Sequence, residues 1–134
     1  PQGPTLVHAA VSVPASRAAV ATLGAQGQLR REVLQAARPT AHGLLQWQIT
    51  VRPDGQRLFD GCLPTLIQWG PTHPTDHMPA SGVTLHSLRA QHPQADTLRA
   101  AYRGLGWTVQ AVAASAPRLC AILQTPRGPI EIHT

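Results

Sequence analysis

The sequence predicts an α+β domain built from two βαβββ modules. Two observations favour this fold class. Residues 6–14 and 83–93 follow one plan, in which an apolar strand that carries a histidine runs into a proline and then into a short amphipathic segment. Each of these stretches is followed by three further strand-like runs. We therefore expect a single domain over residues 1–134, with modules at about 5–70 and 83–134 and a linker at 71–82.

The first module contains one helix and four strand candidates. Its first strand is rich in Val and Ala and ends at Pro14, and Ser16 then provides an N-cap for a helix that Gly24 stops. The next segment fits a strand or a short helical turn, and the proline-containing stretch after it is expected to break it. Alternating apolar residues and turn residues mark the last two strands. The expected bounds are 6–13 for the first strand, 16–23 for the helix, 30–37 for the ambiguous segment, 38–40 for the break, 43–51 and 63–69 for the last two strands, and 52–55 for the turn between them.

The second module repeats this order with clearer signals. Its helix has an apolar side formed by Leu98, Ala101, Tyr102 and Leu105. The linker before it holds three Pro and two Gly over 70–82, so neither a helix nor a strand is expected there. The expected bounds are 83–91 for the first strand, 94–105 for the helix, and 108–114, 118–125 and 129–133 for the remaining strands.

Composition excludes several classes of function. The chain is 43% apolar and lacks an apolar run of about 18 residues, so no membrane partner is expected. The net charge of +5 comes from eleven scattered Arg, and with one Phe and one Tyr the chain lacks a base-stacking platform, so nucleic acid is not an expected partner. Cys62 and Cys120 lack CxxC spacing and have apolar neighbours, which favours buried free thiols and a cytoplasmic location. The first residues lack both a signal-peptide pattern and Met, which indicates a processed chain or a piece of a longer one.

Several stretches resemble a known family. The runs 63–69 (Leu-Pro-Thr-Leu-Ile-Gln-Trp), 81–85 (Ser-Gly-Val-Thr-Leu), 116–119 (Ala-Pro-Arg-Leu) and 125–129 (Thr-Pro-Arg-Gly-Pro) are similar to bacterial glyoxalase-like domain proteins. These are members of the vicinal oxygen chelate superfamily, together with glyoxalase I, extradiol dioxygenases and bleomycin-resistance proteins. The resemblance covers nearly the whole chain, and it implies that the mixed sheets of the two modules curl into an open cup.

The resemblance also implies a metal site. In the superfamily the ligands come from the first and last strands of each unit, and the matching positions in this sequence are His8, Gln68, His86 and Glu131. A divalent cation (Zn, Ni, Mn or Fe) suits such mixed nitrogen and oxygen ligands, and Glu131 would act as both ligand and catalytic base. Gln68 stands where the family often has Glu, which lowers the negative charge of the site. Family members usually carry an earlier module, so this chain would be a C-terminal piece of such a protein.

The residues by themselves leave alternatives open. A buried Glu131 would need a cation, an Arg or a proton, whereas on an edge strand it would face water. His8 and His86 are either metal ligands or hydrogen-bonded strand histidines, and for Gln68 alone a structural role is favoured. The run 73–77 (His-Pro-Thr-Asp-His) could clip a second metal, but a solvated connector is favoured.

Other polar residues have weaker functional signals. His42, His92 and His133 are expected at the surface or in turns. Arg118 and Arg127 flank one strand pair and fit either an anionic substrate or solvated surface. No His lies close in sequence to either Cys, so neither thiol is expected to be a nucleophile.

The function implied by the resemblance is that of a metal-dependent lyase, isomerase or dioxygenase acting on a small molecule with vicinal oxygens. One alternative is a metal-free binding module of the bleomycin-resistance type, with an apolar cup lined by Trp47, Trp69 and Trp107. Another is a non-catalytic half of a larger protein. The expected partner is a small-molecule substrate, and a homodimer is one expected assembly because pairing would cover exposed sheet edges.

Overall fold

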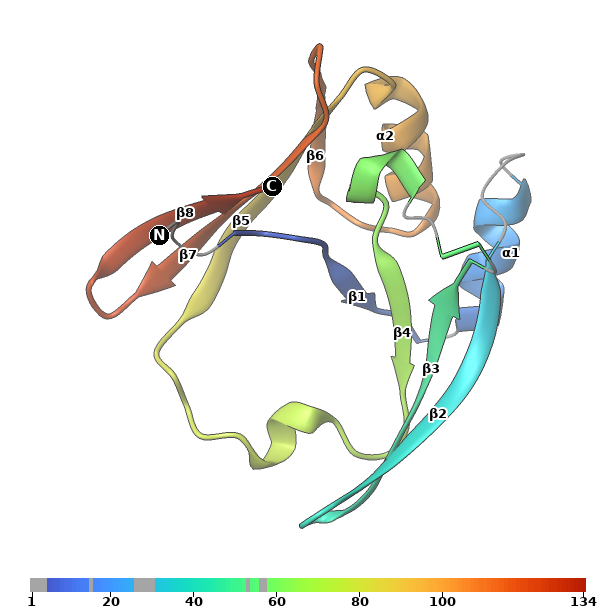
Figure 1. Ribbon diagram of the computed structural model, residues 1–134, viewed down its shortest axis with the longest axis vertical. Coiled ribbons are helices and arrows are strands. Elements are labelled where there is room, and N and C mark those ends of the chain that lie inside the picture. The colour runs from blue at the N-terminus through green and yellow to red at the C-terminus, as the bar shows by residue number, and fades with distance from the viewer. Residues whose placement is uncertain (1–4, 15, 26–30, 53, 56–57) are drawn as a thin grey trace. The chain divides into compact units, whose positions relative to one another are not determined.

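The computed structural model of this protein describes residues 5–14, 16–25, 31–52, 54–55 and 58–134. Within these residues, two α-helices and eight strands follow one another in the order strand, helix and three strands, twice over; Figure 1 shows their course along the chain. The predicted α+β class and the repeated βαβββ order are therefore confirmed. The chain forms two compact units, one around each sheet, and the segments 5–9 and 58–64 belong with the second sheet. The organisation into a single domain stays a prediction.

The first unit is a four-stranded mixed sheet with one helix. The strand order is β1-β4-β3-β2, with β1 parallel to β4 and the other pairs antiparallel. Helix α1 contacts the three strands other than β1 (Figure 1). The elements are β1 (Ala10–Ser12), α1 (Ser16–Ala25), β2 (Glu32–Thr40), β3 (Gly43–Val51) and β4 (Thr65–Trp69).

Three predictions for this unit were wrong in extent. The first strand covers only Ala10–Ser12. The residues before it belong to the unit around the second sheet and form hydrogen bonds there instead of pairing with β4. The stretch 38–40 does not break the structure but completes β2, since this strand lies at the sheet edge, where Pro39 leaves no ladder donor missing. Gly24 lies inside α1, which ends at Ala25. The predicted bounds of β3 are confirmed.

A buried threonine fixes the start of β4 against β3. Thr50 is 3% exposed, and its hydroxyl oxygen accepts a hydrogen bond of 2.9 Å from the Leu66 backbone N–H. The Arg31 guanidinium donates to the same oxygen at 3.3 Å. Burial, and secondarily the nearby Arg52, lower the pKa of Arg31 to about 10. This network sets the register that carries Gln68 two residues further along β4.

The second unit is also a four-stranded mixed sheet with one helix. Its strand order is β6-β5-β7-β8, with β5 parallel to β6 and the other pairs antiparallel. The predicted bounds of the third strand match the structure, and the other elements agree to within two residues. The elements are β5 (Thr84–His92), α2 (Ala95–Gly104), β6 (Gln110–Ala113), β7 (Arg118–Thr125) and β8 (Gly128–His133).

The core of the second unit lies between α2 and one face of its sheet. Ala90 pairs with both Ala111 and Leu119 across the neighbouring strands, so these three side chains share a face, and all are buried. Helix α2 buries Leu98, Ala101 and Tyr102, as its predicted apolar side requires. The opposite face is mixed: it carries Arg89, Gln91, Arg118 and Glu131 together with Val112, Cys120 and Ile122. The residues buried around this core are Leu98, Ala101, Tyr102, Ala90, Ala111, Leu119, Ala121, Cys62 and Leu63.

The two modules repeat their element order but not their strand order. In the first sheet the strand before the helix lies at the edge, next to the last strand of its module. In the second sheet the corresponding strand β5 is central, and the last strand β8 lies at the edge. Positions matched along the sequence therefore occupy different places in the two sheets: Gln68 is on a central strand and Glu131 on an edge strand.

Candidate ligand-binding site

A row of glutamines crosses the first sheet. Gln35 on β2 lies opposite Gln48 on β3, and Gln48 lies opposite Gln68 on β4. Directly paired residues share a face of the sheet, so the three amides form one lateral row. Gln46 precedes Gln48 by two positions and therefore lies on the same face. We call these four residues the glutamine row.

A cavity of about 380 Å³ is bordered by the glutamine row. Its volume falls within the usual range for small-molecule sites, roughly 300–1,000 Å³. None of the described residues that line it is charged, so hydrogen bonding rather than ion pairing would fix a ligand here. A glutamine side chain has an acceptor oxygen and two N–H donors, so it can bond to more than one group at once. The lining residues are Gln35, Ala36, Ala37, Gln46, Trp47, Gln48, Gln68, Trp69 and Gly70.

Small and aromatic residues shape this cavity. Trp47 lies opposite Trp69 across β3 and β4, and their ring centroids are 5.9 Å apart. Side chains alternate along a strand, so both rings lie on the sheet face opposite to the amides of the glutamine row. The Gly70 N–H donates to the Gln46 carbonyl at 2.9 Å, and an added Cβ at Gly70 would lie 3.0 Å from that oxygen. Glycine therefore lets the end of β4 approach Gln46 closely. Trp107, predicted to line a shared cup, belongs to the other unit, where its ring packs edge-on against Tyr102 at 4.9 Å.

Sequence reasoning found only one member of this row. Gln68 was singled out through family resemblance, whereas Gln46 and Gln48 were available from their alternate positions in a strongly predicted strand. Gln35 fell in the segment that fitted either a strand or a helical turn. Recognising the row required the strand pairing, which periodicity within one strand does not specify.

The predicted metal ligand His8 lies before β1 rather than within it. Its Nδ1 is 2.9 Å from the carbonyl oxygen of Gly61, and two residues earlier the Leu6 N–H donates to the His133 carbonyl at 3.2 Å. These bonds hold the segment 5–9 in the second unit and explain why it does not extend the first strand. Because the Gly61 carbonyl oxygen can only accept, His8 Nδ1 carries the proton and donates to it.

The second predicted ligand, His86, lies at a β-bulge. Leu85 pairs with Leu123 and Ser87 with Ile122, so His86 is the extra residue without a partner in the ladder. Its side chain is exposed. Bulges redirect side chains and occur often beside functional sites, but this bulge does not gather other ligands around His86.

Glu131 lies on the edge strand β8 and is exposed, as the second of the two interpretations of this residue required. Its Oε1 accepts a hydrogen bond of 3.1 Å from the Cys120 thiol. Cys120 is 7% exposed, and burial, followed by Glu131, raises the pKa of its thiol. The thiol is therefore a neutral donor to the carboxylate.

The proposed metal ligands do not form a ready metal centre in the second unit. His8, His86 and Glu131 all belong to this unit, whereas Gln68 belongs to the other. Within the part of the chain that the structure describes, no three His, Cys, Asp or Glu side chains lie close enough together to hold an ion. The four-ligand site stays a prediction, and the three residues seen in one unit do not by themselves fit a metal.

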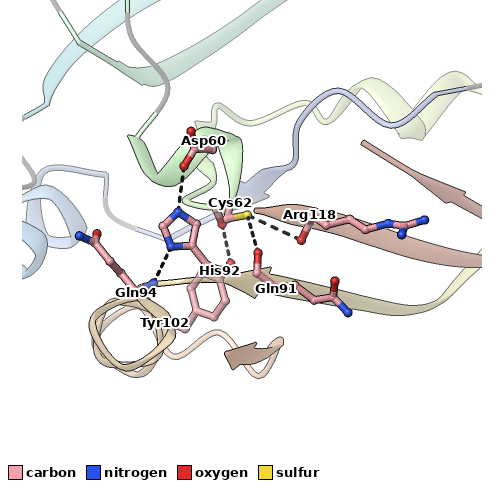
Figure 2. Close-up of polar contacts among 7 residues, drawn as sticks. All are labelled: Asp60, Cys62, Gln91, His92, Gln94, Tyr102 and Arg118. Carbon is pink, nitrogen blue, oxygen red and sulfur yellow. Dashed lines mark hydrogen bonds and ion pairs between the residues drawn. The ribbon is translucent and has the colours of Figure 1, made fainter. Parts of the chain in front are cut away.

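A second polar cluster joins the segment 58–64 to β5 and α2 (Figure 2). His92 Nε2 lies 3.0 Å from Asp60 Oδ2, and His92 Nδ1 accepts a bond of 2.9 Å from the Gln94 backbone N–H. The Tyr102 hydroxyl donates to the Cys62 carbonyl oxygen. His92 is 5% exposed, so the prediction that it lies at the surface or in a turn was wrong.

This cluster is a structural tether rather than a catalytic dyad. Both ring nitrogens of His92 are already engaged, so neither is left to take a proton from a substrate. The Cys62 thiol donates to the carbonyls of Gln91 and Arg118, at 4.0 and 3.8 Å (Figure 2). Burial, followed by Asp60, raises the pKa of this thiol, which opposes thiolate formation. The predictions that both Cys are buried, free and not nucleophilic agree with these contacts.

The linker histidines take part in local packing. Contrary to prediction, the linker contains one 3-10 turn, Pro74–His77, which His73 and Asp76 cap reciprocally. His73 N donates to Asp76 Oδ2 at 2.9 Å. The His77 ring stacks on His42 from the β2–β3 hairpin at a centroid distance of 4.0 Å. The Asp76 carboxylate and His73 Nδ1 are thus bonded within the turn, which disfavours a metal clip over 73–77.

Comparison with known proteins points to one family. A family model described as a glyoxalase-like domain matches residues 1–106. Neither the curated proteins nor the solved structures provide a significant match. No helix in the described ranges is long and apolar enough to cross a membrane.

Proposed function

Because the chain belongs to the glyoxalase-like domain family, we propose that it is a small-molecule binding module whose ligand is held by the glutamine row without a metal ion. The cavity of about 380 Å³ beside four amides is the observation that carries this proposal. An uncharged lining favours a neutral polar ligand. Paired donors and acceptors on neighbouring strands suit a molecule with vicinal oxygens, such as a diol or a hydroxyketone.

The proposal can be tested through the two tryptophans that border the cavity. Trp47 and Trp69 should report binding by a change in fluorescence, and Trp107→Phe removes the background from the other unit. With glycerol and dihydroxyacetone as probes in the presence of EDTA, we expect saturable changes. Gln48→Leu should weaken binding about tenfold, since a lost hydrogen bond with a buried unpaired partner costs about 1–3 kcal/mol.

A matched control separates the row from general effects. Gln124→Leu makes the same chemical change on β7, at an exposed position of the other sheet. It should leave binding unchanged. Equal effects of Gln48→Leu and Gln124→Leu would contradict a role for the glutamine row.

A second candidate function is a metal-dependent lyase, isomerase or dioxygenase that uses His8, Gln68, His86 and Glu131. One observation favours it: His8 directs Nδ1 at the Gly61 carbonyl at 2.9 Å, which is the supporting bond typical of metal-binding histidines. Elemental analysis and a thermal-shift screen with Zn, Ni, Mn and Fe test it. A stoichiometric ion that is lost in Glu131→Gln or His86→Ala, but kept in His133→Ala, would replace the metal-free proposal.

A further inference from the structure

A pair of arginines lies on the mixed face of the second sheet. Arg89 on β5 is opposite Cys120 on β7, and Arg118 on β7 is opposite Gln91 on β5. Arg89 and Arg118 are therefore diagonal neighbours on one face, where Cβ atoms are typically about 7–8 Å apart. This distance is within the reach of two long side chains that converge on one small group.

This pairing differs from the one that the sequence indicated. Arg118 and Arg127 flank β7 along the chain, but β7 runs from Arg118 to Thr125, so they lie at opposite ends of the strand. The partner of Arg118 is Arg89, which only the strand pairing reveals. Figure 2 shows the Arg118 side chain extending away from the Cys62 thiol, with only its carbonyl oxygen bonded there.

The two guanidiniums carry unneutralised charge. Both side chains are exposed, and among the described residues neither has a hydrogen-bond or ion-pair partner. Both are close enough to the Cys120 thiol to oppose the rise in its pKa that burial and Glu131 cause. The nearby carboxylate of Glu131 accepts from Cys120 rather than from either arginine. Two like charges thus face the same region, and the Glu131 carboxylate beside them is bonded to the Cys120 thiol.

We propose that Arg89 and Arg118 form an oxyanion-binding site that takes the carboxylate or phosphate group of a small molecule. Guanidinium groups bind such oxygens through paired N–H donors, and they do so more strongly than an ammonium group at the same place. On this face Gln91 lies opposite Arg118 and Gln110 lies opposite Arg89, so each adds a neutral donor. The site lies in the other unit from the glutamine row and does not depend on the function proposed for that row.

The test is to titrate the full chain with an anion and to monitor the arginine Nε–Hε signals by NMR at each step. Inorganic phosphate and acetate serve as separate probes, with sodium chloride at matched ionic strength as the reference, because screening weakens any exposed charge. We expect saturable shifts at Arg89 and Arg118 with at least one of the two probes. The stronger probe identifies the anion class.

Three Arg→Gln variants, each of which removes one positive charge, separate the proposed site from a general effect of charge. Arg89→Gln and Arg118→Gln should each weaken binding at least tenfold, and Arg89→Lys should weaken it less. Arg127→Gln removes one positive charge from the turn before β8 and should change nothing. Shifts that grow linearly with salt, or equal losses in all three glutamine variants, would overturn the proposal. Thermal melts of each variant confirm that the fold is retained.

Discussion

Asp60 and His92 form the contact that holds the segment 58–64 to β5. Asp60 has a backbone φ of 55°, in the left-handed region that Asn and Asp tolerate better than other side chains. Its carboxylate bonds to a histidine whose side chain is 6% exposed, whereas its own is 64% exposed. An exposed carboxylate, that of Asp60, thus accepts the hydrogen bond of a buried donor, His92 Nε2. Such a bond contributes to stability mainly through the cost of leaving the donor unpaired.

Substitutions at Asp60 should separate charge from hydrogen bonding. Asp60→Asn keeps an acceptor oxygen and tolerates the same φ, so we expect a loss of less than about 1 kcal/mol in the free energy of unfolding. Asp60→Ala leaves His92 Nε2 unpaired and strains the backbone, and should cost about 2–4 kcal/mol. Urea unfolding measures both. Equal losses in the two variants would show that the bond to His92 is not what holds this segment.

The two buried thiols make the free energy of unfolding depend on pH in the alkaline range. The pKa values of Cys62 and Cys120 are raised above the ordinary 9.0, chiefly by burial. In the unfolded chain the thiols ionise near that value, whereas in the folded chain they stay protonated. The stabilisation is therefore complete below pH 9.0 and is lost as pH rises through the folded pKa values.

We accordingly expect the free energy of unfolding to fall between pH 9.0 and about pH 10, with reductant present. Cys120→Ala removes one of the two groups and should flatten this dependence, whatever its effect at neutral pH. A pH-independent free energy of unfolding over this interval would contradict the shifted pKa values.

At the scale of elements, burial on one face explains which parts were predictable. Helix α2 and strand β7 carry their periodicity in Leu98, Ala101, Leu119 and Ala121, and all four side chains are buried. The first strand was predicted over 6–13 but covers only Ala10–Ser12, because the apolar run continues into residues that belong to the second unit. The sequence predicts a break at Pro39, but a strand accepts proline when it lies at the edge of a sheet. The sequence of one strand does not show whether that strand lies at an edge.

The packing of α2 gives a direct prediction of stability. Leu98 is 0% exposed, so Leu98→Ala should lower the free energy of unfolding by about 2–5 kcal/mol through lost burial and the cavity that remains. Leu34 on β2 is 49% exposed, and Leu34→Ala should cost less than about 0.5 kcal/mol. Denaturant unfolding followed by circular dichroism compares them. Similar losses would mean that the helix is not packed as described.

At the scale of the whole molecule, the two modules share an element order but their sheets differ in strand order. The family and the βαβββ order could be inferred from the motif around 63–69 and from periodicity. The strand orders could not, because β1 and β5 have similar sequences but different neighbours in their sheets. As a result, His8, Gln68, His86 and Glu131 were matched by position along the chain rather than by place in a sheet. The glutamine row and the Arg89–Arg118 pair emerge only from cross-strand register.

Isothermal titration calorimetry of the metal-stripped full chain with dihydroxyacetone tests the central claim most directly. The glutamine row predicts saturable binding at one site in EDTA, weakened about tenfold by Gln48→Leu and unchanged by Gln124→Leu. Binding that appears only after a divalent cation is restored, and that disappears in Glu131→Gln, would contradict metal-free recognition by the first sheet.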